Sequence, residues 1–141
     1  MFRNPDADRL RALLREVRTI AVVGLSPKPD RPSHGVSKSM QSFGYRIVPV
    51  NPGPSAVLGE PCWPTLRDLP AEVLASVDLV DVFRQSDAVP GIVDDCIALG
   101  LRRLWLQDGV VDEAAAARAV EAGIEVVMDR CVYRDYVHLI G

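Results

Sequence analysis

The sequence predicts one α/β domain built on a single doubly wound, Rossmann-like parallel sheet of about five strands, with helices on both faces. Short runs of valine, isoleucine and leucine alternate along the chain with segments whose apolar residues recur at helical spacing. The connections between the apolar runs are long enough for the crossovers that parallel strands require. With 141 residues and 48% hydrophobic content, the chain can bury one substantial core. We therefore assign residues 1–141 to one domain.

An amphipathic helix is expected within residues 1–18, packed on the rest of the domain. Asn4 and Pro5 are typical of a helix start, as an N-cap followed by proline at the first helical position. Leucines and a valine then recur at helical spacing. Residues 19–24 follow as a buried strand that ends in glycine. Ser33 is expected to cap the next helix, and Gly44 to end it.

The rest of the chain continues this alternation of strands and helices. The second strand is expected over residues 46–50. Residues 54–70 hold four of the eleven prolines, so we expect a weakly regular region there, with a short strand around 61–63. The later elements are expected as a strand over 77–83, a helix from Ser86 to Gly100, a strand over 103–106, a helix from Asp112 to Gly123, a strand over 124–128 and a C-terminal tail over 132–141.

Composition excludes several classes of function and site. A formal charge of −3 gives no reason to expect nucleic acid or an anionic membrane as a partner. No apolar run approaches the ~20 residues that span a bilayer, and the start of the chain lacks the apolar core of a secretory signal. Cys62, Cys96 and Cys131 are scattered, and the chain has only two histidines. This pattern favours free thiols in a reducing cytoplasm and no metal site.

The segment over residues 19–36 is typical of a nucleotide site, because a strand, a polar loop and a helix start follow one another. A helix N-terminus offers free N–H groups and the positive end of its dipole to phosphate. In open parallel sheets, ligands bind beyond the carboxyl ends of the strands. We therefore expect the functional residues directly after the predicted strands.

The loop after the first strand differs from the dinucleotide fingerprint. Gly24 is followed by Leu25 and Ser26, so the G-x-G-x-x-G pattern is absent. Asn51 stands where an NAD site carries an acidic residue for the ribose. Lys28 and Arg31 add positive charge, which favours a ligand richer in phosphate than NAD, although a solvated surface loop would carry the same cations. The alternative to a phosphate-rich binding module is an NADP-dependent oxidoreductase or another nucleotide-using enzyme.

Several motifs, in the right order, resemble the small stand-alone CoA-binding proteins of the YccU-like family. The resemblance covers roughly residues 17–131, and the same fold resembles the CoA-binding domain of the succinyl-CoA synthetase α subunit. The motifs are AVVGLSPKPDRPSH from Ala21, VNP from Val50, VDVFR from Val80, LWLQ from Leu104 followed by Gly109 and Val110, and VVMDRC from Val126.

This resemblance implies that CoA or an acyl-CoA lies across the strand ends, with its pyrophosphate on the 24–35 loop and helix N-terminus. The synthetase pattern has a lysine after the second strand that this chain lacks, so Lys28 or Arg31 is expected to meet the 3′-phosphate. The implied site residues are Gly24, Ser26, Pro27, Lys28, Arg31, His34, Gly35, Asn51, Pro52, Phe83, Arg84, Gln107, Gly109 and Cys131.

No catalytic residue is assigned, and a non-catalytic binding or regulatory module is favoured. Synthetase chemistry needs a phosphorylatable histidine and a nucleotide-grasp domain, for which 141 residues leave no room. His34 is expected to donate a hydrogen bond to the ligand, and His138 to lie at the surface. A protein partner or self-association is compatible with this sequence, which identifies neither.

Cys131 and a pair of aspartates are further candidates for chemistry. Arg130 beside Cys131 would favour a thiolate, which could form a mixed disulfide with CoA; packing of Cys131 beneath a loop is the alternative. Asp78 and Asp81 are three residues apart on one predicted strand, so they face opposite sides and do not form an acid–base pair. One of them is expected to cap a neighbouring backbone group.

Overall fold

The computed structural model describes residues 2–141 and contains a parallel sheet of five strands in the order β2-β1-β5-β6-β7. The strands are β1 (Thr19–Val23), β2 (Arg46–Val50), β5 (Leu79–Val82), β6 (Arg103–Leu106) and β7 (Glu125–Val127). β1 pairs with β2 on one side and with β5 on the other. The connections therefore reverse direction between β1 and β5, which is the topological switch point. The expected doubly wound α/β fold is confirmed.

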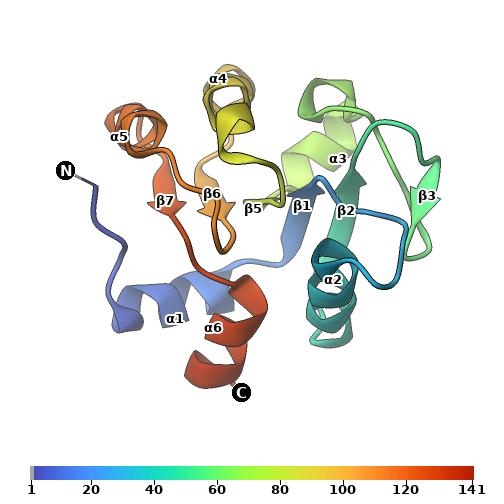
Figure 1. Ribbon diagram of the computed structural model, residues 1–141, viewed down its shortest axis with the longest axis horizontal. Coiled ribbons are helices and arrows are strands. Elements are labelled where there is room, and N and C mark those ends of the chain that lie inside the picture. Colours follow the sequence, from blue (N-terminus) through green and yellow to red (C-terminus); the bar gives the residue numbers. More distant parts are fainter. Residues whose placement is uncertain (1) are drawn as a thin grey trace.

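Helices cover both faces of the sheet (Figure 1). One layer holds α1 (Ala7–Glu16), α2 (Pro32–Ser42) and α6 (Val132–Leu139), and the other holds α3 (Ala71–Ser76), α4 (Val89–Leu99) and α5 (Glu113–Glu121). Because side chains alternate along a strand, each strand contributes to two cores. Ile20 and Val22 belong to the core beneath α1, α2 and α6, whereas Ala21 and Val23 belong to the core beneath α3, α4 and α5.

The proline-rich region extends the β2 edge of the sheet. It forms a small antiparallel pair, β3 (Ala56–Val57) and β4 (Glu60–Pro61), and the 3-10 turn η1 (Leu66–Asp68). A second 3-10 turn, η2 (Ser86–Ala88), leads into α4. Trp63 bridges to Val50, and its N–H donates to the Pro49 carbonyl at 3.2 Å. Pro49 is tolerated because β2 is the last full strand on this side of the sheet.

Two predicted helix caps are wrong. The N-cap of α1 is Asp6, whose carboxylate accepts from the Arg9 N–H at 2.9 Å. Asn4 instead exchanges two hydrogen bonds with the Met128 backbone, at 2.9 and 2.7 Å. Arg31 precedes α2 as its N-cap, and the Ser33 hydroxyl does not cap this helix. Both polar side chains are used by long-range or loop contacts, which local sequence patterns do not reveal.

Two helices were not expected. Residues 132–141, expected as a tail, form α6 over Val132–Leu139, which packs against α1 and α2. The Phe43 ring at the end of α2 stacks on Tyr136 of α6, with ring centroids 4.2 Å apart. The other unexpected helix, α3, has six residues, too few to show helical periodicity in the sequence. Within residues 2–141, no helix has the length and apolarity needed to cross a membrane.

Candidate functional site

A cavity of about 530 Å³ opens at the carboxyl ends of the strands, between the starts of α2 and α6. We call it the switch-point cavity because Gly24, after β1, and Phe83, after β5, both line it. Its lining residues are Gly24, Ser26, Arg31, Pro32, Ser33, Val36, Phe83, Arg84, Gln107, Asp108, Val110 and Cys131.

The structure brings together half of the sequence-predicted site residues in this cavity. Those that line it are Gly24, Ser26, Arg31, Phe83, Arg84, Gln107 and Cys131. Pro52 lines a neighbouring cavity of about 400 Å³, the flanking cavity, which also includes Arg84. Neither cavity is lined by the remaining predicted residues, which are Pro27, Lys28, His34, Gly35, Asn51 and Gly109.

Gly24 allows the ends of three strands to meet. Its N–H donates to the Val50 carbonyl at 2.7 Å, and its φ of +89° is a conformation that other residues rarely adopt. A Cβ atom at this position would lie 2.4 Å from the Phe83 carbonyl oxygen. The glycine therefore sets the close approach of the β1 and β5 ends that forms the floor of the site.

The loop after Gly24 is folded against the start of α2. The Ser33 hydroxyl accepts from the Ser26 N–H at 3.0 Å, and the Ser26 hydroxyl accepts from the Lys28 N–H at 3.1 Å. The first turn of α2 contains no acidic residue. The positive end of the helix dipole therefore faces the cavity, and no acidic side chain within the first turn opposes it.

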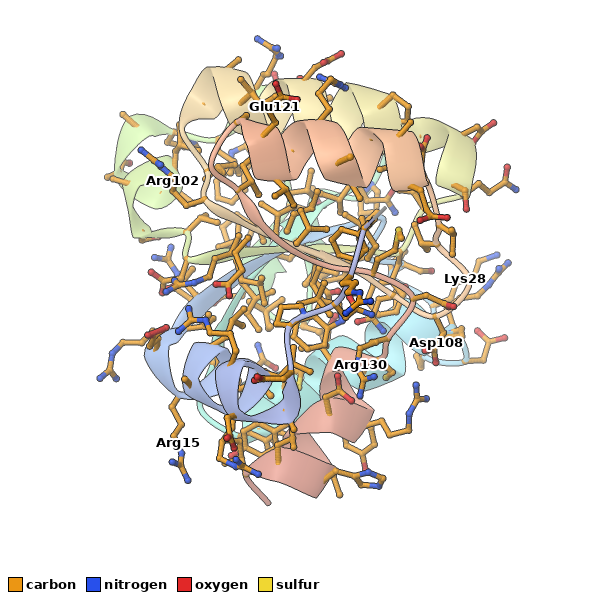
Figure 2. All side chains as sticks on the ribbon, turned by 90° about the vertical axis from the view of Figure 1, so that its left-hand side faces the viewer. Arg15, Lys28, Arg102, Asp108, Glu121 and Arg130 are labelled. Carbon is orange, nitrogen blue, oxygen red and sulfur yellow. The ribbon has the colours of Figure 1, made fainter. Side chains whose placement is uncertain are left out.

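Arg31 and Arg84 are the cations that the cavity offers to a ligand. Within residues 2–141, neither guanidinium has a carboxylate partner within 4.0 Å. Lys28 is exposed on the outer side of the loop, at the rim of the molecule (Figure 2). Because Arg84 lines both the switch-point and the flanking cavity, one extended anion can contact it from either side.

Asp108, the other charged residue in the lining, and Arg130, which precedes Cys131, are already paired. Arg134 forms two hydrogen bonds to Asp108, at 2.9 and 2.8 Å, and this guanidinium holds the pKa of the Asp108 carboxyl below its usual value. Arg130 likewise binds Asp135 through two hydrogen bonds, at 2.7 and 2.8 Å. The net positive charge available to a ligand therefore comes from the arginines without partners.

One wall of the switch-point cavity contains Gln107 and Cys131, and hydrogen bonds fix it to the start of α6. The Gln107 side chain is buried, and its Oε1 accepts from the Val132 N–H at 3.1 Å. The Trp105 indole N–H donates to the Arg130 carbonyl at 2.8 Å. Cys131, directly before α6, is buried in this wall. The guanidinium of Arg130, expected to act on the Cys131 thiol, is bound by the Asp135 carboxylate instead.

Asn51 was expected to face the ligand, but its side chain makes a structural hydrogen bond and lines neither cavity. Its side-chain amide donates to the Leu25 carbonyl at 3.1 Å and so ties the end of β2 to the loop after β1. The Asn51 carbonyl lies 3.5 Å from the Cys62 thiol, and burial raises the pKa of that thiol. Cys96 is buried in the core, where burial raises its pKa to about 12.

Asp78, directly before β5, and Asp81, within β5, have separate surroundings. The Asp78 carboxylate accepts from the Arg18 and Thr19 N–H groups at 2.8 and 3.0 Å, and so caps the start of β1. Asp81 is 1% exposed, and its Oδ1 has no hydrogen-bond partner in the part of the chain that the structure describes. Burial raises the pKa of Asp81 well above its usual value. The two carboxyl groups do not act together.

Five lining residues are not among the individually predicted site residues, although two of them fall within the 24–35 loop expected to hold the pyrophosphate; the five are Pro32, Ser33, Val36, Asp108 and Val110. Three of them form the first turns of α2, and they could have been found from the prediction that this helix points its N-terminus at the ligand. The assembled site presents free guanidinium groups, a free helix N-terminus and apolar side chains. This arrangement is suited to holding an elongated anion with an apolar portion.

Comparisons with known proteins agree with the resemblance seen in the motifs. A family model described as a CoA binding domain matches residues 18–136. Over 131 residues, the sequence is 39% identical to the uncharacterized protein YneT of Bacillus subtilis (strain 168), and the match covers 93% of this chain and 94% of YneT.

Solved structures share the fold. A hypothetical protein from Pyrococcus horikoshii OT3 superposes with a TM-score of 0.90 and 32% identity, over 100% of this chain and 99% of that chain. The acetyl-coenzyme A synthetase 1 of Ca. Korarchaeum cryptofilum, in its apo form, matches with a TM-score of 0.68 and 26% identity, over 83% of this chain and 28% of that one. The motifs predict a relation to the CoA-binding domain of a succinyl-CoA-synthetase-like enzyme, and this relation is confirmed. The chain belongs to the CoA binding domain family.

Proposed function

We propose that the switch-point cavity binds CoA or an acyl-CoA, with the pyrophosphate against the 24–35 loop and the N-terminus of α2. The observation that carries this proposal is the pair of guanidinium groups, Arg31 and Arg84, that lack carboxylate partners and line the cavity. Guanidinium groups bind phosphate through paired N–H donors. The family match and the relation to an acetyl-coenzyme A synthetase support CoA as the source of those phosphates.

The shape of the site suits the two ends of CoA. The switch-point cavity includes the apolar side chains of Val36, Phe83 and Val110, which can pack along a pantetheine arm. The flanking cavity is lined by Pro52 and Arg84, and we assign the adenosine end of CoA to it. We assign the pyrophosphate to the region between them, because Arg84 lines both cavities and Arg31 lines the first.

A binding or regulatory module accounts for the site better than an enzyme. His34 lies outside the lining of both cavities, and His138 is exposed on α6. Asp108 provides the carboxylate in the lining of the switch-point cavity, and it is paired with Arg134. Free arginines and a helix N-terminus bind a ligand, but they do not by themselves exchange its protons or groups. The free state of Cys62, Cys96 and Cys131 suits a reducing compartment, and we infer the cytoplasm.

Isothermal titration calorimetry with CoA, dephospho-CoA and NADPH tests this proposal. CoA is expected to bind with a sub-millimolar dissociation constant and more tightly than NADPH. A weaker affinity for dephospho-CoA would show that the 3′-phosphate is contacted. Saturation by NADPH at lower concentrations than CoA would replace the proposal with the NADP alternative, and absence of CoA binding in this range would reject it.

A further inference from the structure

A third cavity, of about 420 Å³, lies at the opposite edge of the sheet from the switch-point cavity. Thr19 and Arg46, the first residues of β1 and β2, line it, so we call it the amino-end cavity. Arg15 in the last turn of α1 also lines it and projects from the side of the molecule opposite Lys28 and Asp108 (Figure 2). Its volume falls within the range of small-molecule sites.

Unpaired arginines concentrate in this cavity. Its lining includes Arg15, Arg18 and Arg46 but no aspartate or glutamate. In the described part of the chain, none of the three guanidinium groups has a carboxylate within 4.0 Å. The Asp78 carboxylate is held by the backbone N–H of Arg18 at 2.8 Å, and Arg46 donates to the Ser76 hydroxyl at 3.2 Å. The arginines that do form ion pairs are Arg9, Arg11, Arg67, Arg103, Arg118, Arg130 and Arg134.

The distribution of the remaining arginines is uneven. Of the arginines without such a partner, three line the amino-end cavity and two line the switch-point cavity, which leaves Arg3 and Arg102 outside both. In a chain with a net charge of −3, an arginine on the surface has many carboxylates available as partners. Three guanidinium groups left free around one hollow therefore create a local positive field suited to an anion.

The other wall of the amino-end cavity is aromatic and uncharged. Phe43 stacks on Tyr136 with an angle of 7° between the rings, and Tyr45 meets Tyr136 edge-on at 5.9 Å. The Tyr45 hydroxyl donates to the Leu14 carbonyl, which fixes the ring against α1. Burial raises the pKa of Tyr45 to about 12, so its hydroxyl stays neutral at physiological pH. The wall offers apolar contact without opposing the charge of an anion.

We propose that the amino-end cavity binds a small organic anion that carries at least two carboxylate or phosphate groups. Separate guanidinium groups from α1, the α1–β1 connection and β2 can each contact an acidic group, and the aromatic wall can pack on the carbon portion of the ligand. This site is independent of the proposed CoA site, since no residue lines both cavities.

Titration of ¹⁵N-labelled protein with citrate and, separately, with inorganic pyrophosphate tests the proposal. The Arg31→Gln/Arg84→Gln variant is used as the background, because it removes the free guanidinium groups of the switch-point cavity. We expect saturable shifts of the Gly44 and Thr19 amide signals, and no comparable shift at Gly109. Saturation by citrate identifies carboxylate as the recognised group, and saturation by pyrophosphate identifies phosphate; either supports the site.

A charge-matched pair of variants separates a specific site from general attraction. In that background, Arg15→Gln/Arg18→Gln is expected to weaken binding by about tenfold or more, since each charge-assisted contact contributes about that factor. Arg3→Gln/Arg102→Gln removes the same charge outside both cavities and is expected to leave affinity unchanged. Equal weakening by both pairs, or no saturation with either probe by about 10 mM, overturns the proposal. Circular dichroism confirms that each variant is folded.

Discussion

Gly24 approaches the backbone of Phe83 so closely that a Cβ atom on residue 24 would lie 2.4 Å from the Phe83 carbonyl oxygen. Because the Phe83 carbonyl belongs to the backbone, it can make room for a Cβ on residue 24 only if the end of β1 moves away from the end of β5. The contact lies at the topological switch point, where the connections that follow the two neighbouring strands lead to opposite sides of the sheet. The integrity of the fold and the floor of the switch-point cavity therefore depend on the same residue.

Replacement of Gly24 by alanine is expected to lower the free energy of unfolding by about 2 to 4 kcal/mol, because it adds both a steric clash and an unfavourable φ. Urea denaturation measures the change. The matched control is Gly35→Ala, since a Cβ there meets nothing within 4 Å and the residue lies inside α2. That variant is expected to be more stable by about 0.5 to 1 kcal/mol. Similar stabilities for the two variants would contradict the role assigned to Gly24.

Arg84→Gln and Arg31→Gln are each expected to weaken CoA binding by about tenfold, because each removes a charged donor to phosphate. Titration calorimetry gives the affinities. Lys28→Ala should have a smaller effect, since Lys28 lines neither the switch-point cavity nor the flanking cavity. If Lys28→Ala instead abolished the preference for CoA over dephospho-CoA, the 3′-phosphate would lie outside the cavity and Lys28 would bind it.

Gln107→Ala is expected to lower the free energy of unfolding by about 1 to 3 kcal/mol, because it leaves the buried Val132 N–H without its acceptor. The loss should be accompanied by faster hydrogen exchange of the first turn of α6. Gln85→Ala serves as the control, since Gln85 is exposed. Unchanged exchange in α6 would show that Gln107 does not anchor this helix.

Asp81→Asn is expected to reduce the dependence of stability on pH. The folded-state pKa of Asp81 is raised by burial, so the folded protein binds this proton more tightly than the unfolded chain does. The stability contribution is thus fully present below the unfolded pKa of about 4 and falls as pH rises toward the folded pKa. Asparagine keeps the shape of the neutral acid without this titration.

Thermal unfolding of both proteins between about pH 4 and pH 8 measures this difference. Relative to wild type, Asp81→Asn should become progressively more stable as pH rises. A constant difference across that range would show that Asp81 does not titrate in it, and a relative loss of stability at high pH would reverse the assigned sign.

Most of the fold could be predicted because the buried parallel strands are continuous apolar runs, such as residues 19–23 and 79–82. The two unexpected helices differ in how much their sequences indicate. α3 is too short for a periodic signal. In α6, Val132, Tyr136 and Leu139 do recur at helical spacing and form part of the core beneath α1 and α2, so this helix could have been predicted. The caps were wrong because Asn4 bonds to Met128, 124 residues away in the chain.

The region of the candidate site could also be predicted, because the carboxyl ends of parallel strands meet at one edge of the sheet. The sequence did not indicate which loop residues line the cavity, because Arg31 and Lys28 are both exposed and only Arg31 lines it. Nor did it indicate which arginines stay free. Arg134 is neutralised by Asp108, a partner 26 residues away that only the folded structure brings to it.

The proposed role of the switch-point cavity is to hold CoA through Arg31 and Arg84. Native mass spectrometry of the protein mixed with equimolar CoA and NADPH tests it most directly. We predict one dominant complex whose added mass equals that of CoA, and its strong reduction in Arg31→Gln/Arg84→Gln but not in Arg3→Gln/Arg102→Gln. A dominant NADPH complex, or a CoA complex of equal abundance in both double variants, would contradict the account.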